Sequence, residues 1–214
     1  MGTIPLDFVR RPEDEMHAIS RQLLDQLCKR RSVRSFSTDP IPLDVVRHAI
    51  HAAAQAPSGA NKQPWTFVLV TAPDIKQKIR AAAEKEEKTF YEGRAPATWL
   101  EDLEPLGTGW EKPFLEQAPA LIAVFSQSVA PDGSKHYYVK ESVGLACGIL
   151  IATLHLAGLA TLTHTPSPMQ FLCEILERPK NERPFLLMPV GYPAEDCEVP
   201  AIERRTLSEV LVEV

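Results

Sequence analysis

The sequence predicts an α+β protein, an α/β sandwich in which a sheet is covered by helices. Apolar residues recur at helical spacing in some segments and form short β-rich runs in others, and helices are in the majority. An element with one apolar face has to bury it against another layer, which gives this architecture. Neither a GxGxxG after a strand nor a GxxxxGKS/T motif occurs, so Rossmann and P-loop nucleotide sites are disfavoured. The length of 214 residues suits a single domain spanning 1–214.

The composition narrows the classes of function. Hydrophobic residues make up 44% and charged residues 24% of the chain, and the net charge of −5 argues against general nucleic-acid binding. The four cysteines form no CxxC motif and no disulfide framework, which suits a reducing cytoplasm. The most apolar run, 143–159, is interrupted by His155 and predicts a buried helix rather than a membrane span. We therefore expect a cytoplasmic protein without nucleic-acid or membrane partners.

The first part of the chain predicts helices separated by one strand. Apolar residues at every third or fourth position mark two helices, and Pro42 suits the first turn of the second. A run rich in β-branched and aromatic residues marks the strand, and the Pro73-Asp74 pair opens a third helix. In chain order, the predicted arm, helix, helix, strand and helix span 1–13, 16–29, 43–53, 65–71 and 73–87.

Residues 88–113 follow a different pattern. Glycines and prolines interrupt a mixture of aromatic and charged residues, and neither a helix nor a strand period emerges. A segment of this length without periodicity inside a compact chain is usually a functional lid or is disordered. We favour a lid.

The remaining chain alternates strands and helices, beginning with a strand that is apolar on both faces. In chain order, the predicted strand, long helix, strand, short helix and strand span 119–125, 136–156, 159–163, 169–176 and 185–190. Gly144 and Gly148 lie one turn apart in the long helix and permit a close backbone approach, either inside the core or at a dimer contact. The alternating segment 207–214 can add a further strand, including to the sheet of a partner.

The segment Arg30-Arg31-Ser32-Val33-Arg34 is a candidate anion site. It places three guanidiniums and a hydroxyl within five residues, and guanidinium groups bind phosphate through paired hydrogen bonds. The alternative is that these cations stabilise the end of a helix through its dipole. We predict no metal site, because His48 and His51 share a helix face without an acidic third ligand nearby.

Three motifs resemble those of the FMN-dependent nitroreductase superfamily. They are the segment from Arg30 to Phe36, Pro57-Ser58-Gly59-Ala60 with Gln63-Pro64-Trp65, and Pro189-Val190-Gly191-Tyr192-Pro193. The resemblance implies a nitroreductase-like fold, with a central and mostly antiparallel sheet flanked by helices. It also implies FMN as cofactor, an active-site lid at 88–113, and an intertwined homodimer in which the C-terminal tail reaches the partner.

Within this superfamily, the chain is similar to the iodotyrosine deiodinase family of reductive dehalogenases from about residue 20 onwards. The most specific part of the resemblance is Glu87, Tyr91 and Lys112. In the family, residues at these positions hold the zwitterion of a halogenated tyrosine. Glu87 can accept from the ammonium, while Tyr91 and Lys112 can bind the carboxylate. The resemblance further implies that the backbone N–H of Ala60 holds the substrate phenolate.

The resemblance also implies which residues contact the flavin. Five of them meet the phosphate and the ring edge: Arg30, Arg31, Ser32, Arg34 and Arg204. Three lie against the ring from the partner subunit: Pro57, Ser58 and Gly59. Three more come from one short segment: Thr163, His164 and Thr165. A hydrogen bond from the Thr165 hydroxyl to the flavin would favour one-electron steps. Thr165, for this reason, and Ala60, through its N–H to the phenolate, are the candidate catalytic residues.

The expected function is FMN-dependent reductive dehalogenation of iodo-, bromo- or chlorotyrosine to tyrosine and halide. One alternative is a general NAD(P)H-dependent nitroreductase or quinone reductase, which would not need Glu87, Tyr91 and Lys112 together. A second is a protein that binds or fragments its flavin without such turnover. No nicotinamide-binding motif is visible, so the sequence leaves two electron donors open, NAD(P)H and a separate reductase.

Overall fold

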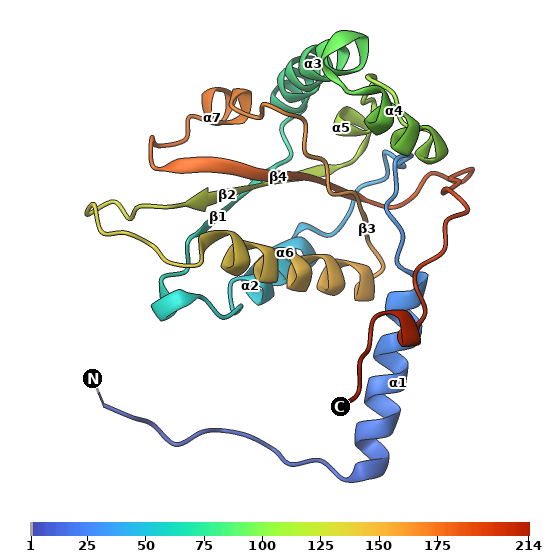
Figure 1. Cartoon of the computed structure of the whole chain (residues 1–214). Helices are drawn as coiled ribbons and strands as arrows, with labels where there is room; N and C mark the ends of the chain where they lie inside the picture. Colours follow the sequence, from blue (N-terminus) through green and yellow to red (C-terminus); the bar gives the residue numbers. More distant parts are fainter. Residues whose placement is uncertain (1) are drawn as a thin grey trace. The chain divides into compact units, whose positions relative to one another are not determined.

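The computed structural model describes residues 2–214 in two compact units, of which the first ends at Arg30 and the second spans Arg31–Val214 (Figure 1). The first unit holds an extended arm and helix α1, Glu13–Lys29, which confirms the predicted first helix. Acidic residues fill the first turn of α1 and Lys29 lies in its last, an order that suits the helix dipole. Most apolar residues of α1 are exposed, Met16 by 58% and Leu24 by 61%, and none is fully buried.

The second unit is built on a four-stranded antiparallel sheet with the order β1-β2-β4-β3. The strands are β1 Trp65–Val70, β2 Ala120–Gln127, β3 Ala160–Thr161 and β4 Glu182–Gly191. The central strand β2 pairs Ile122 with Leu69 on one side and with Met188 on the other. Its residues alternate between two separate core clusters, which confirms that β2 is buried on both faces. Strand β3 is shorter than predicted.

Helices cover both faces of this sheet and confirm the predicted sandwich (Figure 1). Helices α2, Leu43–Ala53, and α6, Val139–Leu156, pack on one face. The other face carries α3, Pro73–Thr89, with the short helices α5, Phe114–Gln117, and α7, Phe171–Ile175.

Helix α6 buries only one of its two apolar faces. Val143, Cys147 and Leu150 lie in the core, whereas Leu145 is 53% exposed, and a Cβ added at Gly148 would meet no atom within 4 Å. The helix begins at Val139 rather than at the predicted residue 136, because Tyr138 has a left-handed φ of 49°. Among residues 2–214, α6 alone is long and apolar enough to cross a membrane by length and composition, but its buried face completes the core.

The predicted irregular segment 88–113 is largely helical. Helix α3 runs into a π-helical turn at Phe90–Arg94, followed by α4, Ala97–Leu103, and a 3₁₀ turn at Glu104–Leu106. Because each piece is short and has a different helical pitch, no single period shows in the sequence. We call 88–113 the lid segment below.

The C-terminal tail enters no sheet in the single chain. Leu207–Glu209 forms a 3₁₀ turn closed by a capping box between Thr206 and Glu209, and none of the described residues after Gly191 belongs to a named strand. The addition of a tail strand to a partner's sheet therefore stays a prediction.

Candidate functional site

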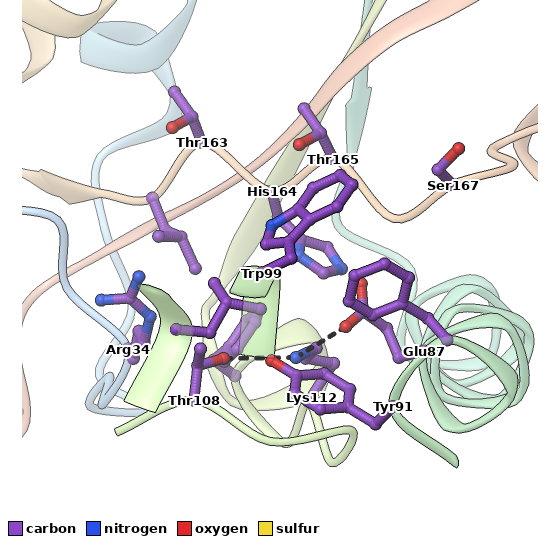
Figure 2. A pocket seen from close by; sticks show the side chains of 14 residues that line it. Arg34, Glu87, Tyr91, Trp99, Thr108, Lys112, Thr163, His164, Thr165 and Ser167 are labelled. Atoms are coloured by element: carbon purple, nitrogen blue, oxygen red, sulfur yellow. Dashed lines mark hydrogen bonds and ion pairs between the residues drawn. The ribbon is translucent and has the colours of Figure 1, made fainter. Parts of the chain in front are cut away.

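A cavity of about 220 Å³ lies between the lid segment and the short stretch that follows β3 (Figure 2). Arg34 contributes to its wall, and the end of α3 contributes Glu87. The other lining residues used below are Tyr91, Trp99, Thr108, Lys112, Phe114, Thr163, His164, Thr165 and Ser167. The volume lies below the roughly 300–1,000 Å³ of sites for drug-sized ligands, so a small single-ring molecule suits it.

An ion pair between Glu87 and Lys112 lies in the wall of this cavity. The Lys112 Nζ lies 3.1 Å from Glu87 Oε2, and both side chains are largely buried. The same ammonium donates to the carbonyl of Gly109 and faces the ring of Tyr91 at 5.5 Å. The three residues that the sequence assigned to one zwitterion therefore converge on one place.

Local structure explains this convergence. Glu87 lies in the last turn of α3, and the π-helical turn that follows carries Tyr91. Lys112 is positioned through its backbone N–H, which donates to Glu84 Oε1 at 2.8 Å. Glu84 is itself held by Arg80 Nε at 2.8 Å, one turn earlier on the same helix. One helix thus positions both halves of the ion pair.

The electrostatics of the cavity are dominated by buried cations. Burial lowers the pKa of the Lys112 ammonium, the nearby Glu87 carboxylate opposes that shift, and the Arg34 charge reinforces it. Burial also lowers the pKa of the Arg34 guanidinium. Glu87 is the one carboxylate among the cavity-lining residues, so the wall carries two cations against one anion.

His164 is buried in the same wall and is neutral. Burial and, to a smaller extent, the charges of Lys112 and Arg34 lower the pKa of its imidazole to about 3. Its backbone N–H and carbonyl both pair with Leu187, and its ring meets Phe114 edge-on at 5.5 Å. The flanking Thr163 and Thr165 also line the cavity, but they are exposed and leave their segment on the side opposite to the His164 ring (Figure 2). This alternation is the ordinary pattern of an extended strand.

Two lid features were missed by sequence reasoning. Arg94 donates to the carbonyl of Ser167 and lies 3.6 Å from Glu86 Oε2, so it ties the lid segment to the stretch after β3. Trp99 packs edge-on against Phe90 at 5.1 Å. The aromatic content of the lid segment was a signal for such packing, whereas the Arg94 contact joins residues too distant in sequence to be paired by pattern.

A second cavity of about 380 Å³ adjoins the arginine-rich segment. It is lined by Ser32 and Arg34, by Leu106 and Gly107 of the lid segment, and by tail residues including Pro200. Arg31 donates to the carbonyl of Pro200, which anchors the tail there. Arg34 lines both cavities. Arg30, Arg31 and Arg204 line neither.

The predicted flavin-contact segment Pro57–Ala60 lies elsewhere. It follows α2, on the sheet face opposite the lid segment, and lines neither cavity (Figure 1). Gly59 fits tightly there, because a Cβ added to it would lie 2.9 Å from the carbonyl oxygen of Tyr137. Ala60 has a left-handed φ of 51°, a strained conformation for a residue with a side chain. The single chain therefore does not bring Ala60 to Glu87.

Comparison with known proteins agrees with this fold. Residues 27–192 match the Nitroreductase family. The chain is 55% identical to the iodotyrosine deiodinase of Haliscomenobacter hydrossis, over 98% of this chain and 96% of that protein. It is 43% identical to the iodotyrosine deiodinase of Nematostella vectensis, over 94% and 78%.

A solved structure gives the same picture. The crystal structure of oxidized iodotyrosine deiodinase bound to FMN and 3-iodo-L-tyrosine matches with a TM-score of 0.78 and 36% identity, covering 86% of this chain and 96% of that one. The chain therefore belongs to the nitroreductase family, and within that family to the iodotyrosine deiodinases.

Proposed function

We propose that this protein is an FMN-dependent oxidoreductase that reductively removes halide from halogenated tyrosines, 3-iodotyrosine above all, and releases tyrosine. The observation that carries the proposal is the convergence of Glu87, Tyr91 and Lys112 on one small cavity. The relative that shares 55% of its residues is an iodotyrosine deiodinase, and the solved relative holds FMN and 3-iodo-L-tyrosine.

The cavity suits the free amino-acid group of such a substrate. Glu87 would accept from the ammonium, and Lys112 would bind the carboxylate with help from the Tyr91 hydroxyl. In the structure Glu87 and Lys112 pair with one another. On binding, the substrate ammonium would replace Lys112 beside Glu87, and the substrate carboxylate would replace Glu87 beside Lys112. A zwitterion makes both replacements at once, whereas a phenol without the amino-acid group makes neither.

The residues present fit FMN. Ser32 and Arg34 line the second cavity and offer a hydroxyl and a guanidinium to a phosphate and a polar ring edge. Arg31 lies next to them in the chain, with its guanidinium on the Pro200 carbonyl. The exposed Thr163 and Thr165 present hydroxyls at the substrate cavity. When bound, FMN would supply the electrons that expel the halide. Thr165 would donate its hydroxyl to a ring nitrogen of the cofactor. The lid segment, tied down through Arg94, would exclude water from the reacting ring.

A homodimer would complete the site. Pro57–Ala60 lie on the α2 and α6 side of the sheet, so a second copy would bring them to the flavin and would offer the Ala60 N–H to the phenolate. The exposed apolar face of α6, with Leu145 and Gly148, supports a contact between copies on that side. The C-terminal tail would then reach the partner subunit.

Anaerobic turnover tests the proposed function. Purified protein loaded with FMN would be reduced with dithionite and mixed with 3-iodotyrosine, and tyrosine would be measured by chromatography. We expect one tyrosine for each iodide released. Absence of tyrosine, together with NAD(P)H-dependent reduction of nitroaromatics or quinones, would favour the general reductase instead. Omitting dithionite and adding NADPH or NADH tests the electron donor.

A further inference from the structure

His164 carries an orphaned polar atom in the wall of the substrate cavity. Among residues 2–214, its Nε2 is the one buried side-chain nitrogen or oxygen without a hydrogen-bond partner. The residue is 7% exposed. An unpaired buried polar atom costs about 1–3 kcal/mol, so such atoms usually meet a ligand or ordered water.

The position of this imidazole is set by the fold. Both backbone groups of His164 are paired with Leu187, at 2.8 and 2.9 Å, and the ring lies against Phe114. Strand alternation turns it toward the side of Glu87 and Lys112 and away from the flanking threonines (Figure 2). The ring is therefore held in place before any ligand binds.

Its surroundings keep the ring neutral. With two cations nearby and a pKa of about 3, the imidazole is neutral at physiological pH. A neutral imidazole has one ring nitrogen with a free lone pair, and Nε2 has that role in the tautomer that carries its proton on Nδ1. A ring that protonated readily would instead add a third positive charge to the wall and repel an ammonium.

The amino-acid group of the proposed substrate needs such an acceptor. A primary ammonium has three N–H donors, and Glu87 is the one carboxylate that lines the cavity. Once the lid excludes water, every donor left unpaired weakens binding. A bond between His164 Nε2 and one N–H of the substrate ammonium would therefore satisfy both groups.

We propose that His164 Nε2 accepts a hydrogen bond from the substrate ammonium, beside Glu87, and so makes the site specific for a free α-amino group. This inference rests on the proposed function, because it assumes an amino-acid substrate in this cavity. It assigns His164 to substrate binding, in contrast to the cofactor contact that the sequence resemblance implied.

A pair of ligands and a pair of variants test the proposal. The ligands are 3-iodotyrosine and its des-amino analogue, 3-(4-hydroxy-3-iodophenyl)propionate. The variants are His164→Phe, which keeps a ring against Phe114, and His164→Gln, which places an amide oxygen near the position of Nε2. Dissociation constants would be measured by quenching of FMN fluorescence in the oxidised holoprotein, with the FMN content of each variant recorded. His48→Phe, an exposed position on α2, is the matched control.

We expect His164→Phe to weaken 3-iodotyrosine binding about tenfold or more and to change binding of the des-amino analogue less than about twofold, since one buried hydrogen bond to a charged group is lost. His164→Gln should recover most of the affinity. Equal weakening of both ligands, or of neither, would overturn the proposal and leave His164 a packing residue.

Two further outcomes are decisive. If His164→Phe fails to fold or to retain FMN, the comparison passes to His164→Asn, whose amide lies near the position of Nδ1. Strong binding by the Gln variant with weak binding by the Asn variant supports the proposal, and equal binding by both overturns it. A wild-type protein that neither binds 3-iodotyrosine nor releases tyrosine overturns the proposed function, and this inference with it.

Discussion

Replacing Glu87 by glutamine removes the one negative charge from the wall of the substrate cavity and changes little else. The Glu87 carboxylate lies 3.1 Å from Lys112 Nζ, and Lys112 is only 3% exposed. Glutamine has nearly the same size and still offers an amide oxygen. The substitution therefore tests the charge itself, both in the empty protein and toward the substrate ammonium.

The size of the effect can be worked from these contacts. Breaking a buried ion pair typically costs about 3–5 kcal/mol. Lys112 keeps the Gly109 carbonyl, and the new amide oxygen can still accept, so we expect a smaller loss of folding stability, about 1–3 kcal/mol. Toward the substrate, a hydrogen bond to a charged group is lost, worth about 1.5–3 kcal/mol. At 1.4 kcal/mol for each factor of ten, 3-iodotyrosine should bind about 10- to 150-fold more weakly.

The assay is a titration of the oxidised holoprotein with 3-iodotyrosine, accompanied by the FMN content and a thermal melt. Glu92→Gln is the matched control, because Glu92 lies five residues beyond Glu87, in the adjoining lid segment, but pairs with Lys88 at 3.7 Å at the exposed surface. We expect that control to change affinity less than about twofold. Equal weakening by both variants, or loss of FMN from Glu87→Gln alone, would refute the assigned role.

Three further predictions concern the lid, the 57–60 segment and the buried imidazole. Arg94→Met should speed amide hydrogen exchange in the lid segment and raise KM several-fold at unchanged FMN content, since the contact to the Ser167 carbonyl is lost; unchanged exchange would contradict this. Gly59→Ala should destabilise the fold by about 1–3 kcal/mol, seen as a lower Tm, because the added Cβ meets backbone at 2.9 Å. Gly93→Ala, whose Cβ would meet nothing within 4 Å, should shift stability by less than about 0.5 kcal/mol. The free energy of unfolding should fall as the pH drops from 6.5 toward 3, because His164 takes up a proton in the unfolded chain but stays neutral in the folded protein, where its pKa is about 3. In His164→Phe, the slope of the free energy of unfolding against pH should be shallower by up to about 1.4 kcal/mol per pH unit, as measured by chemical denaturation. An unchanged slope would contradict this.

Much of the fold was accessible from local sequence patterns. The helices at 13–29 and 43–53 and the buried strand β2 follow from periods that the chain displays directly. The helical structure of the lid segment was not predicted, because a π-helical turn and two short helical pieces share no period. The sequence left open whether the Gly144 and Gly148 face of α6 packs in the core or at a dimer contact, since a helix that is apolar all round does not reveal which side its own chain covers.

The candidate site was accessible only in part. The spacing of Glu87 and Tyr91 places both near one helical face, but the partner Lys112 lies 25 residues beyond Glu87, too far for any local rule to connect them. The orientation of His164 depends on the pairing of its backbone with Leu187, which is a tertiary contact. The Arg94 contact to Ser167 was hidden for the same reason.

The position of Pro57–Ala60 on the α2 and α6 side of the sheet carries a genetic consequence. If each active site combines Glu87 and the lid segment of one chain with residues 57–60 of the other, a defect at Glu87 and a defect at Gly59 affect contributions from different chains. Two inactive variants, expressed together, would then restore one intact site in every mixed dimer. With random pairing, half of the dimers are mixed, so about a quarter of all sites should regain activity. Two variants that are each inactive alone would thus dehalogenate the substrate when expressed together.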